Sequence, residues 1–190
     1  MGGHQSKSYP RQPALVTAQA QPEEGIDDGS SPEDLFKKAK RFVIEGNREF
    51  QIGKWERAEA SYLEGLACLI WLFNIDKEGY PARIEEVTVQ KITKYADKII
   101  EYLQSTNAAE SMGALTHEEF KTGDFQGKDI ALSLSDFLNN LGAVKYVKNE
   151  LKSSLALHQK ALELRIILKS DVSYEVAESY QNLSSVNDAL

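Results

Sequence analysis

Two segments of the chain carry the same pattern of small and bulky residues, and this internal match limits the folds that the chain can adopt. Seven positions superpose without gaps at an offset of 142 − 46 = 96 residues. Small residues recur where two antiparallel helices must approach closely, and bulky residues recur between them, so each segment is predicted to form a helix pair. The matched positions are Gly46, Phe50, Trp55, Ala58, Tyr62, Gly65 and Leu66 in the first segment and Gly142, Tyr146, Leu151, Ser154, His158, Ala161 and Leu162 in the second.

A second internal match extends the pattern toward the C-terminus. The run Asn139-Asn140-Leu141-Gly142 recurs as Gln181-Asn182-Leu183-Ser184, at an offset of 181 − 139 = 42 residues. Apolar residues keep a helical period through these segments, and no run alternates like a strand between turn signals. The sequence therefore predicts an all-α fold built from antiparallel helix pairs.

The composition along the chain divides it into four parts. Residues 1–31 contain several glycines and prolines among glutamine, serine and alanine, and they predict a flexible tail. Residues 32–104 and 130–190 carry the helical periodicity, and we interpret the polar stretch 105–129 as a linker between two helical units. The helix expected over 55–73 is apolar on more than one side, so it should be sandwiched between neighbours.

The second unit stops at Leu190, partway through what the pattern predicts to be another helix pair. Arrays of helical repeats normally end in a capping helix with a polar outer face, and residues 184–190 are too short to form one. We therefore expect either an incomplete product, such as a targeting or regulatory fragment of a larger enzyme, or an array that is closed by self-association.

At its repeated positions the chain resembles the tetratricopeptide repeat (TPR) family. The run Gly46-Asn47-x-x-Phe50-x-x-Gly53-x-Trp55-x-x-Ala58-x-x-x-Tyr62-x-x-Gly65-Leu66 is similar to the helix-turn-helix signature of that family. Residues 139–184 resemble its kinesin-light-chain-like variety. The resemblance implies a non-enzymatic adaptor or scaffold that presents helical grooves to a protein or peptide partner. Glu45, Glu49 and Lys145 depart from the pattern, because these positions are usually apolar or aromatic.

Residues 32–104 also resemble the MIT (microtubule interacting and trafficking) domain, a three-helix bundle that shares the first two helices of the repeat. The ending Tyr95-Ala96-Asp97-Lys98-Ile99-Ile100-Glu101-Tyr102-Leu103 carries this resemblance. It implies a trafficking module that binds membrane-remodelling (ESCRT-type) proteins. The third helix separates the two interpretations. Residues 83–104 would pack along both preceding helices in an MIT domain, and they would begin a new stack in a repeat array.

The TPR resemblance implies that a peptide binds to the inner face of the first helix of each pair. Asn47 and Asn140 fall where chaperone-binding members hold a terminal carboxylate, but Val43 stands where such a clamp needs a lysine. We therefore expect no binding of chaperone tails. For each asparagine, a solvated or cap-like helix residue is the alternative interpretation. The predicted groove residues are Asn47, Gln51, Asn139, Asn140, Tyr146 and Gln181.

The N-terminal run Met1-Gly2-Gly3-His4-Gln5-Ser6 fits the N-myristoylation pattern, with Gly2 as the acceptor. Chance is the alternative explanation, because only Gly2 and Ser6 are strongly constrained. One acyl chain gives marginal membrane binding, so peripheral association with a membrane would need a second signal. The cluster Lys37-Lys38-x-Lys40-Arg41 could supply that signal electrostatically, and a solvated helix face is its other interpretation.

The remaining features argue against catalysis and against nucleic-acid binding. A formal net charge of −7 does not favour a clustered cationic surface for phosphates. His4, His117 and His158 are far apart and lack metal-ligand spacing, and no phosphate loop or nucleophile elbow is visible. We therefore predict no metal site, no cofactor and no enzymatic activity. The single cysteine, Cys68, lies in an apolar run and no secretory signal is visible, so we expect a cytoplasmic protein.

Overall fold

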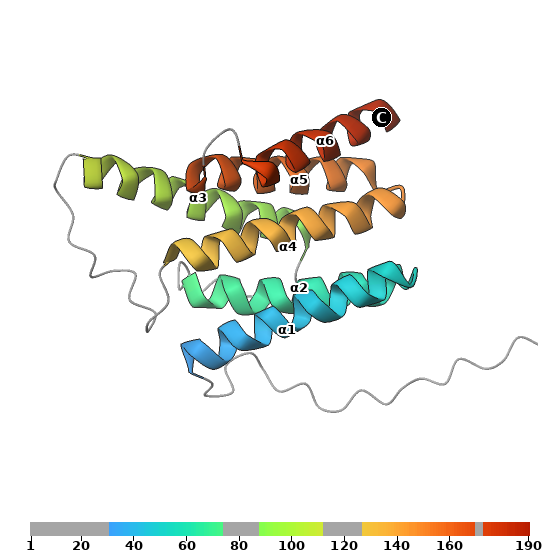
Figure 1. Ribbon diagram of the computed structural model, residues 1–190, viewed down its shortest axis with the longest axis horizontal. Coiled ribbons are helices and arrows are strands. Elements are labelled where there is room, and N and C mark those ends of the chain that lie inside the picture. Colours follow the sequence, from blue (N-terminus) through green and yellow to red (C-terminus); the bar gives the residue numbers. More distant parts are fainter. Residues whose placement is uncertain (1–30, 74–87, 112–126, 170–172) are drawn as a thin grey trace, which may run out of the picture.

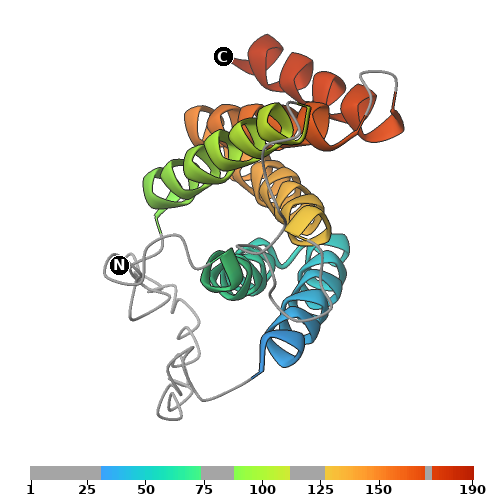
Figure 2. The same cartoon turned by 90° about the vertical axis from the view of Figure 1, so that its left-hand side faces the viewer.

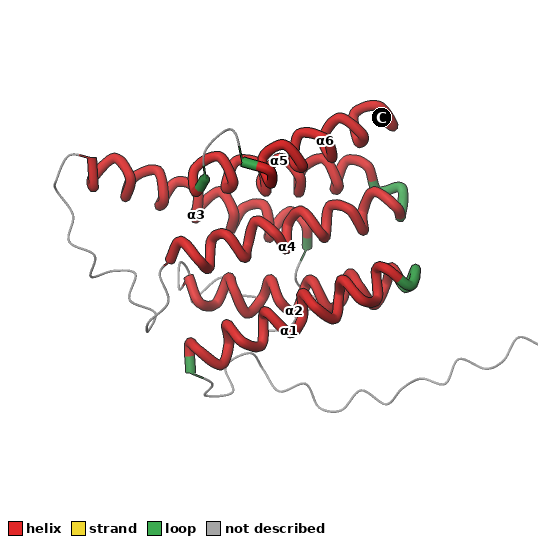
Figure 3. The backbone as a smooth tube through the Cα atoms, viewed as in Figure 1, coloured by secondary structure: helices red, strands yellow, loops and turns green. Residues whose placement is uncertain are grey.

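Six α-helices form the part of the chain that the computed structural model describes, which is residues 31–73, 88–111, 127–169 and 173–190 (Figure 1). Figure 3 shows helices and short turns throughout this part, with no strand, and the prediction of an all-α fold is confirmed there. Gly2, most of the predicted tail and most of the predicted linker lie outside the described residues. The helices are α1 (Pro32–Gln51), α2 (Trp55–Phe73), α3 (Val89–Ser111), α4 (Gly127–Val147), α5 (Leu151–Leu168) and α6 (Tyr174–Ala189).

The helices pack in neighbouring pairs that stack on one another. Helix α1 packs against α2, α4 packs against α5, and α2 contacts α4 where the two pairs meet. Helices α1, α4 and α6 follow one side of the stack, and α2 and α5 follow the other (Figure 2). Helix α3 lies beside α5 and packs chiefly against it, with a smaller contact to α2. Helix α3 therefore does not complete a bundle with α1 and α2.

The turns within the two helix pairs have the same backbone conformation and the same pattern of backbone hydrogen bonds. Gly53 and Asn149, which are 96 residues apart, both have positive φ values, of 75° and 61°. This left-handed conformation suits glycine and is tolerated by asparagine. The amide of Gly53 donates to the Phe50 carbonyl at 3.0 Å, and the amide of Asn149 donates to the Tyr146 carbonyl at 2.9 Å. The turn chemistry thus fixes the same antiparallel reversal twice.

Glycines recur where the two helices of a pair touch, as the internal match predicts. A Cβ atom at Gly46 would overlap the ring of Tyr62, and a Cβ atom at Gly142 would lie 2.8 Å from the Nε2 atom of His158. Tyr62 and His158 occupy matched positions of the repeat. The absence of a side chain therefore lets each first helix approach a ring on the second helix of its pair.

A single hydrophobic core connects α1 to α5. Helix α2 contributes buried side chains on several faces, because α1 and α4 pack against it and α3 touches it. This confirms the expectation that residues 55–73 are sandwiched. Cys68 is buried in the same core. The helices on either side of residues 105–129 share this core, so the segments that the sequence divides into two units pack together as one.

Helices α1 and α6 both begin at a serine cap. The Ser31 hydroxyl accepts from the Asp34 amide at 3.2 Å, and the Ser173 hydroxyl accepts from the Val176 amide at 3.3 Å. Each cap satisfies one of the amide groups that the first turn of a helix leaves free.

Candidate functional site

A pocket lined by side-chain amides and by apolar groups opens between α1 and α4, over the ring of a tyrosine from α2. Its volume is about 150 Å³, and a cavity on the order of this size accommodates a benzene-sized group. The pocket brings together three of the six predicted groove residues, which are Asn47, Gln51 and Asn140. Sequence reasoning missed the other three residues that line it. Phe50 and Tyr62 occupy repeat positions that predict packing, and Ala143 lies outside the matched positions.

The amide of Asn47 is held in place by two hydrogen bonds. Its Oδ1 atom accepts from the Tyr62 hydroxyl at 2.6 Å and from the Asn140 Nδ2 atom at 3.2 Å. Burial raises the pKa of Tyr62 to about 12, so the hydroxyl stays protonated and remains a donor. These bonds join α1, α2 and α4 at the base of the pocket.

Several hydrogen-bonding groups at the pocket have no internal partner. The Asn47 amide nitrogen and the Asn140 carbonyl oxygen take no part in the bonds described above. Within the described residues, the side-chain amide of Gln51 forms no hydrogen bond. Side-chain amides supply both donors and acceptors. Among the described residues, those that line the pocket carry no charge, so it suits an uncharged polar group better than a carboxylate or an ammonium.

The face of α4 that adjoins the pocket is partly apolar. Asn140, Ala143 and Val147 are spaced by three and four residues and therefore share one face of the helix. Val147 is 44% exposed. Tyr146, which the sequence predicts as a groove residue, is 38% exposed on the same turn but does not line the pocket.

Asn139 does not face the groove, contrary to the prediction from the repeat position. It is buried, and its Oδ1 atom accepts from the Asn182 amide of α6 at 2.9 Å. The same oxygen lies 3.0 Å from Nδ1 of His158. Because this oxygen can only accept, Nδ1 of His158 must carry the proton. Asn139 therefore joins α4, α5 and α6.

The two asparagine clusters follow one plan. In each, an asparagine oxygen on the first helix of a pair receives one bond from the second helix and one from an asparagine amide on the next helix of the same side. The donors are Tyr62 and Asn140 in the first cluster, and His158 and Asn182 in the second. Asn140 and Asn182 are matched by the 42-residue repeat. Gln181, the sixth predicted groove residue, is exposed on α6 away from the pocket.

Two of the departures from the TPR pattern form ion pairs across the turns. Glu49 pairs with Lys54 at 3.7 Å in the first turn, and Lys145 pairs with Glu150 at 2.8 Å in the second. The positions match at the 96-residue offset, and the charges are reversed. Lys145 also pairs with Glu59 on α2, which links the two helix pairs. Burial alone would raise the pKa of Glu59, but hydrogen bonds from Lys145 and Lys148 outweigh it, and the net pKa is lowered.

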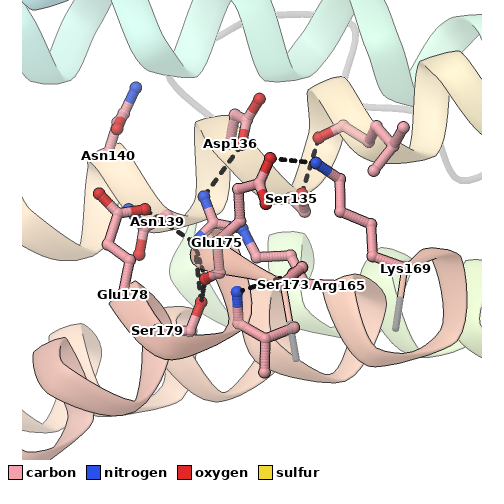
Figure 4. Close-up of polar contacts among 12 residues, drawn as sticks. Ser135, Asp136, Asn139, Asn140, Arg165, Lys169, Ser173, Glu175, Glu178 and Ser179 are labelled. Carbon is pink, nitrogen blue, oxygen red and sulfur yellow. Dashed lines mark hydrogen bonds and ion pairs between the residues drawn. The ribbon is translucent and has the colours of Figure 1, made fainter. Parts of the chain in front are cut away.

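Arg165 ties α6 to the stack (Figure 4). This side chain is 3% exposed, and it donates to Asp136 on α4 at 2.9 Å. It also donates to the Ser179 hydroxyl at 2.8 Å, to the Glu178 carboxylate at 3.1 Å and to the Glu175 carbonyl at 2.9 Å. A planar guanidinium suits such a fan of acceptors. All of these charges are paired internally, so the cluster serves packing and does not offer an anion site.

The structure contains little that resembles a catalytic or metal centre in its described part. No group of three or more histidine, cysteine, aspartate or glutamate side chains is placed there to hold a metal ion. His158 is buried between α4 and α5, as its repeat position predicts. None of the described helices combines the length and the apolar character that crossing a membrane requires.

Comparison with known proteins gives the chain no family. No family model matches it, and no curated protein or solved structure is significantly similar to it.

Proposed function

We propose that the chain is a non-enzymatic adaptor that binds an uncharged peptide segment of a partner protein in the pocket between α1 and α4. The observation that carries this proposal is the set of unpartnered amide groups of Asn47, Gln51 and Asn140 around one opening. Donors and acceptors held at fixed positions are suited to a peptide backbone, which presents both kinds of group. The opening beside Ala143 would take an apolar side chain of the same peptide.

The charge of the pocket decides which peptide it would prefer. A terminal carboxylate requires cationic donors, and none lines this pocket among the described residues. The proposed ligand is therefore an internal segment with one bulky apolar residue between uncharged polar neighbours.

The placement of α3 favours a repeat-like adaptor over an MIT-type trafficking module. The MIT alternative requires the third helix to run along the first two. Helix α3 instead packs chiefly against α5, and α4 takes the position next to α2. The proposed groove depends on that arrangement, since Asn140 and Ala143 come from α4.

Filling the pocket is expected to weaken peptide binding. Peptides would be selected from a displayed random library against the full chain and then measured with Ala143→Trp, whose indole would occupy the opening. We expect affinity to fall by at least about ten-fold, which corresponds to about 1.4 kcal/mol. Ala177→Trp, at an exposed position of α6, is the matched control and should bind normally. Equal affinity in both variants would contradict the pocket, and a preference for acidic C-termini would contradict its uncharged specificity.

We also propose that Gly2 carries a myristoyl chain that tethers this adaptor to a membrane. The support is the sequence Met1-Gly2-Gly3-His4-Gln5-Ser6, which offers an N-terminal glycine and a serine at the required spacing. Labelled myristate should be incorporated into the wild-type chain in cells and should be absent from Gly2→Ala. Gly3→Ala is the control and should retain the label. A wild-type chain without label would exclude the tether.

A further inference from the structure

The outward face of α1 carries a stripe of cations interleaved with isoleucines. We define the cationic stripe by residues that are separated by four, three, four and four positions. The spacing places the first four on one helix face, and the last, Ile52, is the C-cap residue that follows the end of α1. Leu35, Ala39 and Gly46 are buried, and each lies two residues before a member of the stripe. Two residues correspond to about 200° of rotation, so the stripe points away from α2. It consists of Lys37, Arg41, Ile44, Arg48 and Ile52.

The side chains of the stripe are exposed to an unusual degree. Ile44 is 68% exposed and Ile52 is 55% exposed, although both are large and apolar. Within the described residues, neither Arg41 nor Arg48 forms an ion pair. Lys37 pairs with Asp34 only at 3.7 Å, with both side chains well exposed, and such pairs contribute little to stability. The cations of the stripe are therefore available to an external anion.

We propose that the cationic stripe of α1 binds the anionic headgroups of a membrane surface. Cations interleaved with exposed apolar side chains are the combination that interfacial helices use. The cations approach anionic lipids while the apolar side chains enter the boundary between headgroups and acyl chains. Burial of Ile44 and Ile52 in that boundary explains why a helix that is otherwise packed exposes them. The stripe lies opposite the buried face of α1 and beside the pocket, because Asn47 and Gln51 follow Ile44 and Arg48 by three residues on the same helix.

A second copy of the chain would be the other possible occupant, but its charges fit less well. Helix α6 is the acidic helix of the stack, with Glu175, Glu178 and Asp188 and no lysine or arginine. Glu175 already pairs with Lys169, and Glu178 already pairs with Arg165. Asp188 alone is left to complement three cations. The internal pairing of α6 therefore favours the lipid surface.

The stripe would supply the second signal that a single acyl chain at Gly2 needs. The affinity of the stripe for lipid does not depend on acylation, so the stripe is tested in the chain without the acyl group. The unmodified full-length chain would be sedimented with phosphatidylcholine vesicles that contain about 30 mol% phosphatidylserine, and with vesicles of phosphatidylcholine alone. We expect association with the anionic vesicles only, and we expect added salt to weaken it.

Two variants test the two chemical parts of the stripe. Lys37→Glu/Arg41→Glu/Arg48→Glu should lower the partition coefficient by at least about 100-fold, because each cation near an anionic surface contributes about five-fold. Ile44→Ser/Ile52→Ser keeps the charge and should lower it by about ten-fold through the loss of apolar burial. Arg57→Glu/Lys94→Glu/Lys152→Glu changes the net charge equally at exposed positions of other helices, and it should retain more binding than the stripe variant.

Three results would overturn the proposal. One is equal association with both kinds of vesicle. Another is an equal loss of binding in the two charge variants, which would indicate only an overall effect of charge. The third is a concentration-dependent increase in molecular mass that the stripe variant abolishes, in a chain that does not bind vesicles. That result would identify a second copy as the occupant. All substituted side chains are exposed, so circular dichroism should report unchanged helix content in each variant.

Discussion

Replacing Gly65 with valine is expected to lower the free energy of unfolding by about 3 kcal/mol, at the upper end of the cost of overpacking a core. Even a single Cβ atom at this position would overlap the ring of Phe137, and it would lie 3.2 Å from the Cβ atom of Phe42. The Phe137 ring cannot move aside freely, because it is 2% exposed and packs edge-on against Tyr62 at a centroid distance of 6.3 Å. Urea unfolding followed by helical circular dichroism measures the change.

A control on the same helix separates this clash from helix propensity. Ala60 is exposed on α2, so Ala60→Val should cost only about 0.5 kcal/mol from the lower helix propensity of valine. The Phe137→Ala substitution should also cost less in the Gly65→Val background than in the wild type, since the two side chains compete for one space. Equal stability of Gly65→Val and Ala60→Val would show that the two helix pairs do not meet at this glycine.

Gly65 also illustrates which parts of the fold the sequence could predict. The repeat indicated that a small residue is required at this position, and the helical period indicated which segments form helices. Both inferences use local patterns, because the helical period depends on neighbours in the chain. The partner of Gly65 lies on α4, 72 residues away by the difference 137 − 65. No local pattern identifies such a partner.

The position of α3 was the part of the fold that local patterns left open. Its apolar stripe predicts a buried face but fits α1 and α2 as well as it fits α5. In the structure, Lys160 on α5 pairs with Asp97 on α3 at 2.7 Å, beside the apolar contact of the two helices. A single carboxylate on an amphipathic helix carries no signal of this kind, because surface charges are common on helices.

The candidate site, like the fold, could be predicted from the sequence only in part. The structure brings Asn47, Gln51 and Asn140 together around one opening, whereas the repeat positions also assign Asn139, one residue before Asn140, to the groove. Successive residues point about 100° apart on a helix, so adjacent asparagines cannot both face one groove. Which asparagine faces the groove depends on His158 and Asn182, because both contact the Oδ1 atom of Asn139. That choice is a property of three helices together.

His158 gives the second large effect, which is a loss of stability in mild acid. Burial, aided by the positive charge of Arg165, lowers its pKa to about 4. An unfolded chain has a histidine pKa of about 6.5. Between these values the unfolded state binds a proton that the folded state excludes, so the free energy of unfolding should fall by about 1.4 kcal/mol per pH unit. Above about pH 6.5 the histidine is neutral in both states and does not reduce the free energy of unfolding. By about pH 4 its protonation in the unfolded state has lowered the free energy of unfolding by about 3 kcal/mol.

The buried environment of His158 explains why protonation is opposed. Its Nδ1 hydrogen already bonds to Asn139, so a second proton would go to Nε2, which faces the backbone near Gly142 and not solvent. Glu59 also has a shifted pKa, but its pKa is lowered, so its contribution is lost only below its ordinary range. The interval between about pH 6.5 and 5 therefore reports on the histidines.

Unfolding by urea at a series of pH values tests this assignment. His158→Gln should abolish the slope between about pH 6.5 and 5, whereas His4→Gln/His117→Gln should leave it unchanged. In nuclear magnetic resonance spectra, the His158 ring protons of the folded chain should titrate with a midpoint near 4, as its pKa predicts. If the slope disappears in His4→Gln/His117→Gln, the titrating group is one of these two histidines and not His158. A His158 midpoint near its ordinary value would mean that water reaches Nε2 and that the α4–α5 interface opens in solution.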